Sequence, residues 1–112
     1  MAVDLTAAAT LPAQGSAALA GNNKVLEVLY DNRAEHISVY FASGSASVCF
    51  DDVGELEDGG DVGSAPQTPL VAGTPNEIRV GERLGDGVRS RGRLFLTSAT
   101  TPTFYIVAEV GT

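Results

Sequence analysis

Hydrophobic and polar residues alternate along most of the chain with the two-residue period of a β-strand. The clearest case is the segment 31–52 (DNRAEHISVYFASGSASVCFDD), where Ile37, Val39 and Phe41 fall on one side and the intervening residues on the other. A Ser-Gly-Ser sequence at 43–45 suits a tight turn into a second strand. The segment therefore predicts a hairpin with one buried face.

Similar short segments recur, separated by Gly, Pro, Asn and Asp. The predicted strands lie at 3–11, 24–31, 36–42, 46–51, 69–72, 76–82, 91–98 and 103–110. No ten-residue stretch carries a helical period, although 51–60 contains enough helix formers for one helical turn. We predict an all-β fold, namely a single antiparallel β-sandwich or jelly roll of seven to eight short strands.

The first twenty residues differ from the rest, because they are rich in Ala, Thr and Ser. We interpret residues 1–20 as an extended N-terminal arm and residues 21–112 as the β-sandwich domain. The arm either frays or orders against a neighbouring subunit. In the second case its contacts are predicted for the apolar residues Val3, Leu5 and Leu11.

Composition narrows the possible partners. The chain has 112 residues, 44% of them hydrophobic and 19% charged, which suits one domain with one core. Its net charge of −7 argues against nucleic acid as a partner, because binding nucleic acid requires an excess of Lys and Arg.

No apolar run is long enough for a bilayer and no secretory signal is recognisable, so we expect a soluble protein made in the cytoplasm. Cys49, the single cysteine, lies among apolar residues and is predicted to be buried and unreactive.

Two segments concentrate charge. The acidic loop, residues 51–63, contains six carboxylates that make weak calcium candidates: Asp51, Asp52, Glu55, Glu57, Asp58 and Asp61. Their spacing does not match an EF-hand, so a solvated loop, or one that meets basic residues of a neighbour, is favoured, and no metal or cofactor is predicted. The basic segment, residues 77–93, carries arginines suited to pairing with a neighbouring subunit's carboxylates: Arg79, Arg83, Arg89, Arg91 and Arg93.

No group of residues predicts catalysis. His36 is the sole histidine, and no G-x-S-x-G sequence supplies a nucleophile, so we predict a surface or edge histidine at the start of a strand. The glycine-rich stretch 81–87 lacks both the P-loop ending and the dinucleotide-binding spacing. A sugar-binding surface would have only tyrosines for stacking, and each lies in a strand where it is able to join the core: Tyr30, Tyr40 and Tyr105. We therefore predict that the protein is not an enzyme.

Three segments in order, 31–50, LVAGTPNEIRV at 70–80 and RLFLTSATTPTFYIVAEV at 93–110, form a recognisable pattern. Together they resemble the small β-sandwich virion proteins of tailed bacteriophages, over residues 22–110. The resemblance implies a capsid decoration (cement) protein that binds the major capsid protein on the outside of the shell and stabilises it. It further implies a homo-oligomer, with a trimer favoured, located on the virion. The alternative is a tail or neck component, or a tip protein that binds the host surface.

Overall fold

The computed structural model describes residues 2–5, 13–30, 34–50, 56–80 and 92–109, and these form nine β-strands and no helix. The strands are β1 (Val3–Asp4), β2 (Ala13–Ala18), β3 (Val25–Leu29), β4 (His36–Tyr40), β5 (Ala46–Cys49), β6 (Thr68–Leu70), β7 (Asn76–Arg79), β8 (Arg93–Thr97) and β9 (Thr103–Glu109). Over these residues, then, there is no helix of the length and hydrophobicity that a membrane span requires.

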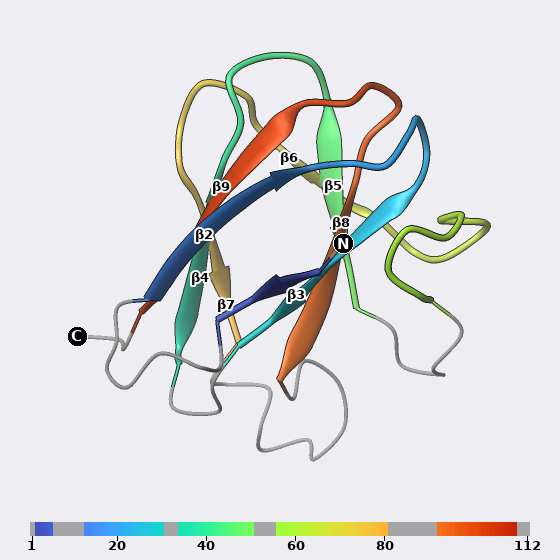
Figure 1. Cartoon of the computed structure of the whole chain (residues 1–112). Coiled ribbons are helices and arrows are strands. Elements are labelled where there is room, and N and C mark those ends of the chain that lie inside the picture. The colour runs from blue at the N-terminus through green and yellow to red at the C-terminus, as the bar shows by residue number, and fades with distance from the viewer. Residues whose placement is uncertain (1, 6–12, 31–33, 51–55, 81–91, 110–112) are drawn as a thin grey trace.

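The strands form two sheets (Figure 1). Sheet A has the order β1-β3-β8-β5-β6, and sheet B has the order β2-β9-β4-β7. The predicted all-β sandwich is confirmed. One pair departs from the expected antiparallel arrangement, because β1 runs parallel to β3, with Val3 opposite Val28. The intervening strand β2 belongs to the opposite sheet, so the chain crosses over and re-enters sheet A in its original direction.

The main core lies between the two sheets and follows the predicted alternation. Ile37, Val39 and Phe41 are fully buried, and so are Phe104 and Ile106 from β9. The rings of Phe41 and Phe104 meet edge to face, with their centroids 5.7 Å apart. This geometry is favourable for aromatic pairs, and it ties β9 to the chain just after the neighbouring strand β4.

The N-terminal residues differ from the predicted arm. Val3 and Leu5 are buried in the main core, and β2 pairs with β9 along its whole length. A Cβ atom on Gly15 would lie 2.9 Å from Cγ1 of Val3 and 3.3 Å from Cδ2 of Leu5, so the glycine leaves the space that these two side chains fill. The described part of residues 1–20 therefore belongs to the sandwich, and only Val3–Asp4 of the predicted strand 3–11 is seen as a strand.

The described part of the acidic loop covers part of the outer face of sheet A. Leu56 and Val62 pack against Val25, Cys49 and Phe95, which point away from the main core, and form a second hydrophobic cluster. Residues 56–60 contain a turn and no helix, so the helical turn considered for this region is not seen there. Sheet A is thus buried on both faces at Val25, Cys49 and Phe95, and the loop is a structural cover there.

Backbone hydrogen bonds attach the same loop to the edge of β3. Val25 N donates to Gly60 O at 2.9 Å, and Gly59 N donates to Val25 O at 2.8 Å. The Asp58 carboxylate accepts a hydrogen bond from the backbone N–H of Glu27 at 3.0 Å. These contacts pair polar backbone groups that β1 is too short to reach.

Candidate binding face on sheet B

The outward side chains of sheet B form a surface that we call the sheet B face. It comprises Gln14, Ser16, Ala18, His36, Ser38, Tyr40, Glu77, Arg79, Thr103, Tyr105, Val107 and Glu109. Whereas the loop covers part of the outer face of sheet A, Gln14, Ser16 and Tyr105 are exposed. Sheet B therefore has one face in the core and one face open to a partner.

Strand register places these side chains in two rows across the sheet. Ser16 lies opposite Tyr105, which lies opposite Tyr40 on its other side. In the adjacent row Gln14 lies opposite Val107, which lies opposite Ser38. The alternation of each strand directs these residues to the same face, so β2, β9 and β4 together build the surface.

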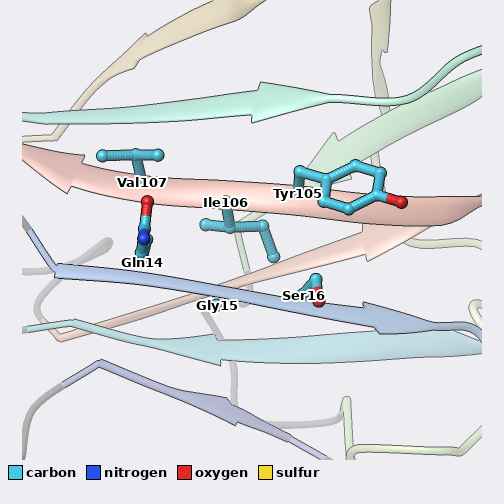
Figure 2. A pocket seen from close by; sticks show the side chains of 6 residues that line it. All are labelled: Gln14, Gly15, Ser16, Tyr105, Ile106 and Val107. Carbon is cyan, nitrogen blue, oxygen red and sulfur yellow. The ribbon is translucent and has the colours of Figure 1, made fainter.

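An open pocket of about 390 Å³ lies between β2 and β9 (Figure 2). Its lining consists of Gln14, Gly15, Ser16, Tyr105, Ile106 and Val107. Figure 2 shows Gln14 beside Val107 and Ser16 near the ring of Tyr105. An aromatic ring next to an amide and a hydroxyl gives apolar contact area together with hydrogen-bonding groups, which is the composition of protein-recognition surfaces.

Tyr105 is the most exposed aromatic side chain among the described residues, at 52%. Its ring centroid lies 6.2 Å from that of Tyr40, with the ring planes inclined at 46°. The neighbouring ring supports Tyr105 on one side and leaves the other side available. Sequence reasoning named both tyrosines as candidates for stacking and weighed them against a place in the core; the structure puts Tyr105 on the surface.

Two pocket residues, Gln14 and Ser16, were missed by sequence reasoning because residues 12–20 were taken for part of the arm and its linker. The signal was present, since these polar residues alternate with Ala13, Gly15 and Ala17. Small residues make such alternation weak in hydrophobicity, although the structure buries or half-buries all three.

His36 begins β4, as predicted, but β4 lies between β7 and β9 and is not an edge strand. The imidazole is mostly buried, with 17% of the side chain exposed. Its Nδ1 lies 3.4 Å from Oε1 of Glu77, outside hydrogen-bond geometry. His36 lies at the charged end of the sheet B face, in register with Arg79 and Glu109, whereas Glu77 lies opposite Ser38 and ends one of the central rows.

The structure describes two arginines of the basic segment, Arg79 and Arg93. Arg79 is exposed on β7. Arg93 is held within the chain, because its guanidinium lies 3.2 Å from the Glu27 carboxylate and 5.2 Å from the centroid of the Phe95 ring. The remaining predicted interface residues lie outside the described residues: Leu11, Arg83, Arg89 and Arg91. Val3 and Leu5, also predicted for an interface, pack inside the chain's own core.

The calcium candidates are likewise divided. Asp61 forms an ion pair with Lys24 at 2.6 Å, and Asp58 binds the Glu27 backbone. Glu57 is exposed. Asp51, Asp52 and Glu55 lie outside the described residues. Within the parts of the chain that the structure describes, no three His, Cys, Asp or Glu side chains gather as a metal site would require. The basic residue that meets the loop comes from the same chain.

Cys49 is fully buried in the second hydrophobic cluster, as predicted. Burial removes water from the thiol and disfavours the thiolate, which raises the pKa of Cys49 to about 11. At neutral pH the side chain is therefore a neutral packing group.

No known protein family matches the chain, and no curated protein matches it. Among solved structures, one chain described as "Bacillus endospore appendages form a novel family of disulfide-linked pili" is similar over 90% of this chain and 88% of its own length. The two share 12% sequence identity with a TM-score of 0.41.

Proposed function

We propose that this protein is a structural virion protein that binds the outside of a phage capsid and stabilises it. The observation that carries the proposal is the difference between the two sheets. The acidic loop covers part of the outer face of sheet A, whereas the outer face of sheet B leaves Tyr105 on β9 exposed beside Gln14 and Ser16 on the edge strand β2. The sequence resemblance to small phage virion sandwiches supplies the class of partner, the major capsid protein.

The chemistry of the face suits a protein surface. Over β2, β9 and β4 its central rows contain hydroxyl, amide, aromatic and apolar groups, and the Glu77 carboxylate on β7 ends one of these rows, in a chain whose net charge is −7. Burying uncharged groups avoids the large desolvation cost of unpaired charges. Tyrosine is enriched at the centres of protein interfaces, because a rigid ring gives much contact area at a small entropic cost.

Stabilisation in this proposal needs no catalysis and no cofactor. A protein that binds only the assembled shell shifts the equilibrium away from disassembly by mass action. At a free concentration of 100 times Kd, one site contributes about 2.7 kcal/mol to the assembled state. Many copies on one particle multiply this effect.

Co-sedimentation tests the proposal directly. The purified protein is mixed with expanded, undecorated heads of its phage, the particles are pelleted, and bound protein is quantified against its concentration. The proposal predicts saturable binding and a higher temperature for head disruption. Recovery of the protein with isolated tails and its absence from heads would instead assign it to the tail or neck, or to a tip that binds the host.

A further inference from the structure

Strand β2 forms one edge of sheet B and carries neither a charge nor a proline. Its six residues, AQGSAA, pair with β9 on one side, and among the described strands none pairs with the other side. Strand β1 contacts β2 but belongs to sheet A. Because backbone N–H and C=O groups of an antiparallel strand alternate in direction, about half of those in β2 face the unpaired side.

The other three sheet edges carry features that hinder strand pairing. Strand β6 has three residues and includes Pro69, which has no N–H to donate. Strand β7 carries the charged residues Glu77 and Arg79. Strand β1 has two residues, and the acidic loop bonds the adjacent part of the β3 edge. Natural proteins use such features to prevent edge-to-edge association, and β2 has none of them.

We propose that two copies of this chain pair through β2, antiparallel to each other, and merge their four-stranded sheets into one continuous sheet. The edge is self-complementary, because it is uncharged and built from small or uncharged polar residues. With a net charge of −7, identical copies repel one another over most approaches. A neutral edge is the place where this repulsion is weakest and where new backbone hydrogen bonds form.

A two-fold axis perpendicular to the sheet relates the two copies and keeps their outward side chains on the same side. In a register centred on Gly15 or Ser16, small residues meet at the axis. The two sheet B faces then form one continuous surface with a Tyr105 pocket on each side of the axis. This inference goes beyond the proposed function and holds for any partner of that face. It replaces the trimer that the resemblance favours with a two-fold pair.

Sedimentation equilibrium of the full chain over a wide concentration range measures the pairing. We expect the mass to rise from 11.5 kDa towards twice that value. The test variant is the double substitution Gln14→Lys with Ala18→Lys, at two exposed outward positions of β2. The control is Gln67→Lys with Thr68→Lys, which adds the same charge at exposed positions by β6.

The added lysines act on association in two opposite ways: a lower net charge favours it, whereas lysines that face each other across paired β2 strands oppose it. Both double variants change the net charge by two, from −7 to −5, which weakens general repulsion. If β2 is the pairing edge, lysines brought together across the axis weaken association about tenfold or more in the β2 variant, while the control pairs at least as well as the parent. Equal pairing by both variants would overturn the proposal, as would a parent chain that stays monomeric or forms a trimer.

A crosslinking measurement is independent of any effect of lysine on folding. In a Ser16→Cys variant the new thiol is exposed, whereas Cys49 is buried and its raised pKa keeps it neutral. We expect a short bis-maleimide to give a covalent dimer of Ser16→Cys and to give monomer with the control Thr68→Cys. Absence of the dimer with Ser16→Cys, at concentrations where the parent sediments as a pair, would contradict pairing through β2.

Discussion

Tyr105 on β9 lies directly opposite Tyr40 on β4, and the two rings rest against each other on the outer face of sheet B. Tyr40 is half-buried, whereas Tyr105 projects from the surface. The more buried ring thus holds the more exposed one in place beside the pocket. A ring that is already positioned loses little freedom on binding, which makes Tyr105 the expected centre of an interface.

Tyr105→Ala tests this role. We expect binding to heads to weaken about tenfold or more, the scale of an interface hot spot, while the free energy of unfolding changes by less than about 1 kcal/mol. Val71→Ala is the matched control, because Val71 is also exposed, at 62%, and lies outside the sheet B face. Co-sedimentation and urea unfolding report the two quantities. Equal binding by both variants would remove Tyr105 from the interface.

Gly15→Ala tests the packing of the N-terminal residues into the core. The new methyl group would lie 2.9 Å from a methyl group of Val3, so we expect the free energy of unfolding to fall by about 1–3 kcal/mol, as for overpacked cores. At Gly21 the same substitution meets only Cγ of Lys24 at 3.6 Å, an ordinary contact, and serves as control. If Gly15→Ala unfolds at the same urea concentration as the control, Val3 and Leu5 do not pack there in solution.

Asp58→Ala tests the structural role of the acidic loop. The Glu27 N–H would lose its acceptor, and we expect the free energy of unfolding to fall by about 1–3 kcal/mol. Glu57→Ala removes the same charge from the adjacent, exposed residue and is expected to change it by less than about 0.5 kcal/mol. A similar small effect of both substitutions would show that charge alone, and not the hydrogen bond, matters at this loop.

The Cys49 thiol predicts a specific loss of stability in alkali. Its pKa is about 11 in the folded chain and 9.0 for an ordinary thiol, so between these values the unfolded state releases a proton that the folded state keeps. The contribution is fully present below pH 9 and is lost as the pH rises through 11, at up to about 1.4 kcal/mol per pH unit. Urea unfolding against pH measures this loss. In Cys49→Ala the free energy of unfolding should fall less between pH 9 and 11 than it does in the parent protein. Parallel curves for the two proteins would contradict the burial of the thiol.

Sequence patterns predicted the interior of the fold better than its ends. The alternation of Ile37, Val39 and Phe41 with polar residues predicted a buried face correctly. Such alternation of large apolar residues has one strong physical cause, which is burial on one side of a strand. Strand β2 was missed because its inward residues are Ala13, Gly15 and Ala17, whose burial contributes little hydrophobic contrast. The missing side chain of Gly15 is what Val3 and Leu5 require, a relationship between distant residues that local pattern does not reveal.

The candidate site, like the fold, was predicted only in part from the sequence. Sequence reasoning looked for function in charged residues, at the acidic loop and the arginines. In the structure, Asp58, Asp61 and Arg93 bind groups of their own chain. The open surface instead combines β2, β9 and β4, which come from three distant parts of the sequence. Only the pairing order of the strands brings Gln14 and Ser16 beside Tyr105.

An electron-microscopy map of the decorated particle is the most direct test of the central claim, that the protein binds a capsid through the sheet B face. The account predicts sandwich density on the outside of the shell, with Tyr105, Gln14 and Ser16 against a capsid subunit and the acidic loop directed away from it. Particles that carry the protein only on the tail, or a sandwich whose sheet B face points into solvent, would contradict the account.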